Sequence, residues 1–176
     1  AYANDIEFKG VSTSEKFWDE VITKFFTKYH GLQRWHQKIC TQVRQTGKLE
    51  VPSGRIYTFT PEQSYKGLKW PDTKIKNYPC QGFGADLVLL ARLHAYHAVQ
   101  RAGLQDEVLF VCTVHDSIVV DTPSKHVDTV AKILYNAVAA IPAQCERLFG
   151  YTIGVPMTSE VHVGPTKGNM DEYKFT

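Results

Sequence analysis

The tripeptide His115-Asp116-Ser117 interrupts two apolar, β-rich runs, Val108–Val114 before it and Ile118–Val120 after it. Two such runs joined by a few polar residues predict a β-hairpin that holds Asp116 rigidly at its tip. A carboxylate in this position suits Mg²⁺, a hard cation that prefers oxygen ligands and keeps several waters. Two such ions, about 3.5–4 Å apart, can stabilise both the attacking and the leaving oxygen in phosphoryl transfer.

Two other interpretations compete for these residues. Taken alone, the tripeptide also fits an ordinary polar turn. Ser117 near His115 could suggest a hydrolase, but the sequence has no Gly-x-Ser-x-Gly nucleophile turn. The surrounding sequence must therefore decide what the tip does.

The elements around the tip follow from apolar periodicity and from turn residues. We expect helices separated by β-hairpins, which indicates an α+β fold with helices packed on an antiparallel sheet. The first helix would begin at Ser14 as its cap and bury its aromatic face, which includes Phe17, Phe25 and Tyr29. The other expected elements are a helix over 32–45, a hairpin over 48–59, a loop over 60–75, a helix over 81–102, helices from 123 to 149, a strand over 155–163 and a polar tail over 164–176.

Charge is distributed unevenly along the chain. Residues 14–76 hold 12 Lys/Arg against 6 Asp/Glu, whereas residues 77–176 hold 7 against 10. A basic front and an acidic back suit a protein that holds a polyanion on one side and metal ions on the other. A solvated helical face is the simpler alternative. The four cysteines have no zinc-site spacing, so we expect free thiols.

Four blocks of the chain resemble, in the same order, the C-terminal part of family A DNA polymerases, the group related to bacterial DNA polymerase I and phage replicases. The third block runs from Asn77 to Asp86. It opens with Asn77-Tyr78-Pro79-Cys80-Gln81-Gly82 and is similar to the Asn-x-Pro-x-Gln-Gly segment of that family. The fourth, Val114 to Asp121, resembles the third sequence motif of the palm. The supporting blocks are 29–36, 47–57 and the segment 155–164.

This resemblance implies roles for particular residues. Asp116 would be a catalytic carboxylate that holds the metal pair, with His115 beside the primer terminus. Asn77 and Gln81 would hydrogen-bond the nucleic acid, because amides both donate and accept hydrogen bonds without charge. The other implied DNA contacts are Arg55, Lys74 and Lys76. Arg55 would touch phosphate or brace the hairpin, with neither role favoured.

The chain departs from the family pattern at two positions. Ser117 stands where the family usually has Glu, so the metal affinity of the tip would be lower, or Ser117 would bind the metal through a water. Thr73 stands where the family commonly has arginine, with Lys74 and Lys76 nearby. No match is found to the first palm motif, which carries the second aspartate, or to the fingers helix that grips the nucleotide.

The resemblance therefore implies an incomplete polymerase. The expected division is a lead-in over 1–13, the C-terminal part of the fingers with a β-hairpin and a basic loop over 14–76, and the C-terminal palm over 77–176. Implied partners are Mg²⁺, primer-template DNA, dNTP and the remaining polymerase segments, in the same chain or as a split partner. We expect no membrane association and a cytoplasmic location in a bacterial or phage-infected cell. The alternatives are a catalytically inactive nucleic-acid-binding module and a metal-dependent phosphohydrolase.

Overall fold

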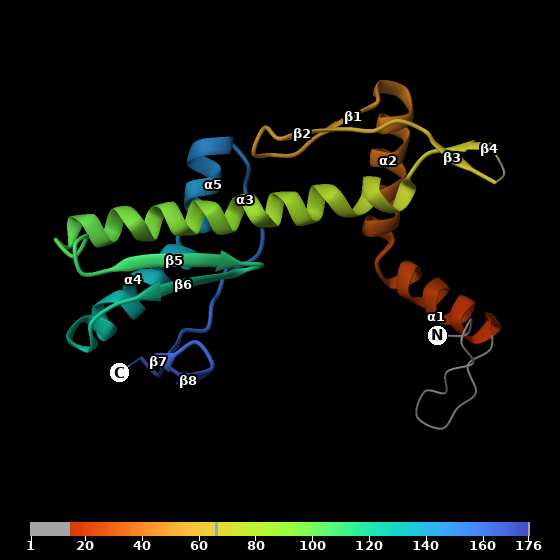
Figure 1. Ribbon diagram of the computed structural model, residues 1–176. Helices are drawn as coiled ribbons and strands as arrows, with labels where there is room; N and C mark the ends of the chain where they lie inside the picture. Colours follow the sequence, from red (N-terminus) through yellow and green to blue (C-terminus); the bar gives the residue numbers. More distant parts are fainter. Residues whose placement is uncertain (1–14, 66, 176) are drawn as a thin grey trace. The chain divides into compact units, whose positions relative to one another are not determined.

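The computed structural model describes residues 15–65 and 67–175 (Figure 1). Its helices are α1 (Glu15–Lys28), α2 (His30–Thr46), α3 (Asp72–Arg101), α4 (Val127–Ala139) and α5 (Ile141–Phe149), with a 3₁₀ turn, η2 (Ser124–His126), before α4. Its strands are β1 (Lys48–Glu50), β2 (Ile56–Thr58), β3 (Glu62–Ser64), β4 (Gly67–Lys69), β5 (Leu109–Val114), β6 (Ser117–Asp121), β7 (His162–Thr166) and β8 (Asn169–Glu172).

Consecutive strands pair within four two-stranded sheets in the described part of the chain. The pairs β3–β4, β5–β6 and β7–β8 are antiparallel. Helices and two-stranded hairpins thus share the chain, which confirms the predicted α+β class.

The described residues divide into two compact units. One consists of residues 15–49 with 58–76, and the other of Glu50–Tyr57 with residues 77–175. Helix α3 carries residues of both units.

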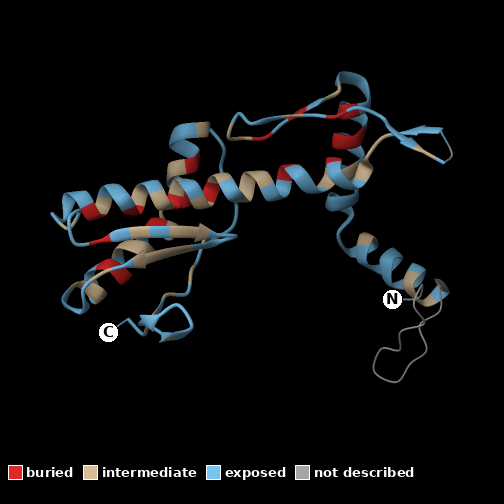
Figure 2. Ribbon diagram, in the orientation of Figure 1, coloured by how far each residue is buried: buried red, intermediate tan, exposed pale blue. Residues whose placement is uncertain are grey.

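The first unit is built around α2 and the start of α3. Val43 and Ile75 are completely buried, and Ile39 and Cys40 of α2 are nearly so; Figure 2 marks the buried positions along α2. Arg44 donates hydrogen bonds of 2.8 and 2.7 Å to the two carboxylate oxygens of Asp72. This ion pair anchors the first turn of α3. The negative charge of Asp72 also interacts favourably with the positive end of the helix dipole there.

The second unit buries one face of α3 against β5–β6 and the last two helices. One cluster joins Leu87 and Ala91 of α3 to Ile141 and Cys145 of α5, with Ile118 packed against it. A second cluster joins Val99, Val108 and Val130, and lies at the other end of the hairpin. The hairpin is therefore fixed to α3 at both ends by apolar contacts.

Several sequence predictions were wrong in detail. Helix α3 begins at Asp72 rather than Gln81 and continues through Pro79, because the buried Ile75 and the Asp72–Arg44 ion pair hold the turns before the proline. The expected loop over 60–75 contains β3 and β4. These strands are only three residues each, and alternation over so short a span gives no periodic signal.

The C-terminal prediction was also wrong. The strand expected over 155–163 begins only at His162, because Met157 packs against the α3–α5 cluster instead of joining a ladder. The expected polar tail holds β8, and beyond it the Tyr173 hydroxyl donates a 2.6 Å hydrogen bond to Asp128. A hairpin and a tertiary contact thus replace the loose end.

The apolar face predicted for the first helix is largely uncovered, and its aromatic residues Phe17, Trp18 and Phe26 are only half-buried. Val21, Ile22, Phe25 and Tyr29 are exposed in the described part of the chain. Helical periodicity reports an apolar stripe but not what covers it. The predicted cap Ser14 and the lead-in over 1–13 lie outside the described residues.

Candidate active site at the β5–β6 turn

The turn between β5 and β6 consists of two residues, His115 and Asp116. Val114 and Ser117 face each other as the last pair of the ladder. His115 has a positive φ of 53°, a conformation in which histidine is enriched among non-glycine residues. The Ser117 hydroxyl donates a 2.9 Å hydrogen bond to the carbonyl of Val114 and closes the turn. Residues 114–117 are exposed, so Asp116 is presented to solvent on a defined backbone.

Helix α3 and strand β5 run antiparallel along their contact. Arg92 contacts Thr113, the Tyr96 ring lies 5.9 Å from that of Phe110, and Val99 packs with Val108. Moving toward the turn along β5 thus means moving toward the N-terminal end of α3. Ile118, the second residue of β6, accordingly packs against the cluster that contains Leu87, and Phe83 packs against the same cluster. The turn lies at the end of the contact that is nearest to Gln81.

Asn77 and Gln81 are exposed on α3 and four residues apart, so they lie on one face of the helix. Lys74 and Lys76 belong to the first unit. Lys74 forms a 2.7 Å ion pair with Glu62, and Lys76 is half-buried. The structure thus places three of the predicted DNA-binding residues, Asn77, Gln81 and Arg55, in the second unit and the two lysines in the first.

Arg55 pairs with a residue to which the sequence assigned no role. Its guanidinium donates two hydrogen bonds to the Asp86 carboxylate, one of them 3.2 Å long, and the Ser53 hydroxyl donates a third. Hydrogen bonding from Arg55 is the main cause that lowers the pKa of Asp86, and Ser53 adds to it against the opposing effect of burial. The same hydrogen bond raises the pKa of Arg55. Asp86 therefore stays ionised and fixes the β1–β2 turn to α3.

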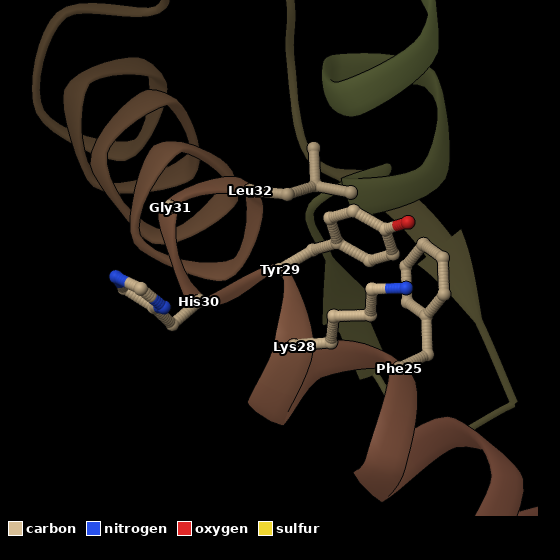
Figure 3. Close-up of a pocket in the computed structure, with 6 residues that line it drawn as sticks. All are labelled: Phe25, Lys28, Tyr29, His30, Gly31 and Leu32. Atoms are coloured by element: carbon tan, nitrogen blue, oxygen red, sulfur yellow. The ribbon is translucent and has the colours of Figure 1, made fainter.

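A separate concave surface lies in the first unit, between α1 and α2 (Figure 3). Its lining residues are Phe25, Lys28, Tyr29, His30, Gly31 and Leu32, and its volume is about 480 Å³. The Phe25 and Tyr29 rings are 4.9 Å apart, and the Lys28 ammonium lies 5.4 Å from the centroid of the Tyr29 ring. None of these lining residues carries a carboxylate.

Comparison with known proteins identifies the family of this chain. The sequence model described as "DNA polymerase family A" matches residues 8–169. The chain belongs to DNA polymerase family A. It is 24% identical over 172 residues to the DNA polymerase of Bacillus phage SP01, which covers 97% of this chain and 18% of the phage protein. It is also 24% identical over 145 residues to the thermostable DNA polymerase I of Thermus aquaticus, covering 81% and 16%.

A solved structure shares the fold of this family A chain. It is the POL domain of Pol1 from M. smegmatis in complex with DNA primer-template and dNTP, with a TM-score of 0.67 and 17% identity. The match covers 83% of this chain and 24% of that one. The chain thus spans less than a fifth of the curated relatives above. No helix in the described residues is long and apolar enough to cross a membrane.

Family A polymerases generally use divalent metals, so the donor set at the turn can be tested against such an ion. Asp116 supplies one exposed carboxylate, and the described residues gather no group of three His, Cys, Asp or Glu that could hold an ion. Mg²⁺ is usually bound through one or two carboxylates, waters and substrate phosphates. The turn therefore offers one ligand position for such an ion, and a complete site would need further ligands.

Sequence reasoning missed two residues that shape this region, Asp86 and Arg92. Asp86 ends the Gln81–Asp86 stretch that resembles the family segment, and that position was the one available signal. Arg92 carried no motif at all. Both act through tertiary pairing, which periodicity and local spacing do not reveal.

Proposed function

We propose that this chain is the C-terminal portion of a DNA-directed DNA polymerase and that Asp116 is one of its metal-binding catalytic carboxylates. The observation that carries the proposal is the exposed Asp116 carboxylate at the β5–β6 turn. The hairpin that holds it packs on α3, the helix that bears Asn77 and Gln81. The reaction would be template-directed nucleotidyl transfer from dNTP in DNA replication.

Asp116 would hold a divalent cation, which we take to be Mg²⁺. A pair of metal ions, when bound, supplies electrostatic stabilisation of the attacking and leaving oxygens. Asp116 fixes the position of that charge, because the turn around it is closed by Ser117 and fastened to α3. The Ser117 hydroxyl donates a hydrogen bond to the carbonyl of Val114, and its oxygen stays free to accept one, so we assign it contact with the metal through a water.

His115, Asn77 and Gln81 would position the primer end. An amide can donate to the minor-groove acceptors that every correct base pair presents, so Asn77 and Gln81 can sense pairing without reading sequence. His115 precedes the carboxylate in the turn and would lie beside the primer terminus. We assign Lys74 and Lys76 to phosphate contacts and Arg55 to bracing, because its guanidinium is already bound to Asp86.

The chain would work only as part of a larger polymerase. It spans 18% of the phage relative, and the second metal-binding aspartate, the nucleotide-gripping helix and the thumb would come from the remaining segments. They would lie in the same polypeptide or in a split partner. Leu109 and Val111 of β5 are 64% and 53% exposed, and an exposed apolar strand is a natural surface for a further strand to pair with.

Primer extension tests this proposal. The chain, a polypeptide carrying the remaining family A segments, and their mixture would each be given primer-template, dNTP and Mg²⁺. We expect no extension by this chain alone and template-directed extension by the mixture. DNA binding by a correctly folded mixture without any synthesis would overturn the proposal and favour the inactive binding module. Hydrolysis of a simple phosphodiester by the chain alone would favour the phosphohydrolase.

A further inference from the structure

Arg92 lies in the middle of α3 and reaches across to β5. It is half-buried, and its Nη1 donates a 3.0 Å hydrogen bond to the Thr113 hydroxyl. Its Nη2 lies 3.4 Å from the carbonyl oxygen of Phe110, a longer and weaker hydrogen bond. One guanidinium therefore holds two points of the strand that leads into the Asp116 turn.

The two points lie on either side of an irregularity in the ladder. Phe110 pairs with Val120, but the next pair is Cys112 with Val119, so Val111 is an extra residue on β5. A bulge of this kind bends a strand and changes the direction of the residues beyond it. The residues beyond it are Thr113 and Val114, followed by the turn. Where Asp116 points thus depends on how the bulge is held.

Packing alone does not require arginine at this position. No carboxylate in the described residues forms an ion pair with Arg92, and its helix neighbours Ala91 and Ala95 are completely or almost completely buried. A half-buried arginine loses hydration that an apolar residue of similar length would not lose. An apolar residue lacks the N–H donors that the planar guanidinium holds in a fixed geometry.

We propose that Arg92 is a positioning residue that sets the direction of the Asp116 carboxylate by holding the β5 bulge at Phe110 and Thr113. This inference rests on the proposed role of Asp116. Arg92 acts from α3 on one side of the hairpin, while the Ser117–Val114 hydrogen bond closes the turn itself. The bulge and the turn are thus fixed separately.

The test uses the complete polymerase that contains this chain. Arg92→Met keeps the length of the side chain and removes both hydrogen bonds, and Arg92→Lys keeps the charge but cannot serve both acceptors in the same geometry. We expect Arg92→Met to lower kcat about 10- to 100-fold, because small displacements of catalytic groups have effects of this size. The KM for dNTP and the Kd for primer-template should change less than about threefold. The Mg²⁺ concentration for half-maximal rate should rise.

Thr113→Val offers a milder variant and guards against misfolding of Arg92→Met. It should lower kcat in the same direction, and the double variant should lose less than the product of the two single effects, because both remove one interaction. Arg101→Met, an exposed arginine at the end of the same helix, is the matched control and should leave kcat and the Mg²⁺ dependence unchanged.

The outcomes separate this inference from the proposed function. Asp116→Asn is assayed beside the other variants. If Asp116→Asn is inactive while folded Arg92→Met and Thr113→Val keep wild-type kcat and Mg²⁺ dependence, Arg92 has no positioning role and the proposed function stands. If Asp116→Asn keeps full activity, the proposed function itself fails.

Discussion

The Arg55 guanidinium donates two hydrogen bonds to the Asp86 carboxylate, which fastens the β1–β2 turn to α3 within the second unit. The Asp86 side chain is only 12% exposed, whereas that of Arg55 is 48% exposed. Asp86 is thus the more buried member of the pair, and it also accepts a hydrogen bond from the Ser53 hydroxyl. The residues that would touch DNA and metal are not part of this pair, so it can be altered separately from them.

Removal of the Asp86 carboxylate should destabilise the fold. Asp86→Ala leaves the donors of Arg55 and Ser53 without their acceptor, and losing hydrogen bonds to a charged, partly buried group costs about 1–3 kcal/mol in the free energy of unfolding. Urea denaturation of the chain measures this, with Asp121→Ala, an exposed acid on β6, as the control. Equal unfolding midpoints for Asp86→Ala and the wild type would show that the pair contributes nothing.

The same pair predicts a pH dependence of stability. The folded-state pKa of Asp86 is lowered, mainly by the hydrogen bond from Arg55, so the unfolded chain binds a proton at this site more readily. The contribution is fully present above the unfolded pKa of about 4, and is lost as the pH falls through the lower folded value. Asp86→Asn should show a shallower loss of stability below about pH 4 in urea denaturation. Parallel curves for the two proteins would exclude this linkage.

The positive φ of His115 allows its backbone and side-chain roles to be separated. Glycine adopts this φ without strain, so His115→Gly should leave the unfolding free energy within about 1 kcal/mol of the wild type. A β-branched residue fits this region poorly, so His115→Val should be less stable than His115→Gly. If the imidazole lies beside the primer terminus, folded His115→Gly should extend primers more slowly. If folded His115→Gly extended primers at the wild-type rate, His115 would have no role at the site.

The Tyr57 side chain occupies the space that a side chain at position 82 would need. A Cβ on Gly82 would overlap the Tyr57 hydroxyl and lie 2.8 Å from Cζ of the ring. Gly82→Ala must therefore displace the ring, and overpacking of this kind costs about 1–3 kcal/mol. Adding Tyr57→Leu, which shortens the side chain, should restore part of the loss in a thermal melt. Gly84→Ala, where the added Cβ has open space, is the control and should not lower the melting temperature.

The sequence revealed the elements whose signal is local. The hairpin around His115-Asp116-Ser117 was predicted because apolar runs flank it, and β5 and β6 confirm it, with Ser117 as the first residue of β6. The start of α3 was not predicted, because Pro79 indicates a helix boundary and it is tertiary contacts, the burial of Ile75 and the Asp72–Arg44 ion pair, that override it. Asp86 and Arg92 could not be given roles, because their partners lie 31 to 33 and 18 to 21 residues away in the chain. The roles of Asp116, Asn77 and Gln81 remain predictions drawn from the family resemblance and their placement.

The central claim is that Asp116 holds catalytic metal. The most direct measurement is the single-turnover rate of nucleotide incorporation, as a function of Mg²⁺ concentration, by the complete polymerase carrying Asp116→Asn. Asp121→Asn, at the far end of the same strand, is the matched control. We predict that Asp116→Asn lowers the rate about 100-fold or more with primer-template binding nearly unchanged, since a fixed charge aimed at the transition state contributes at least this much. The Asp121→Asn rate should match the wild type. A wild-type rate and Mg²⁺ dependence for Asp116→Asn would contradict the account.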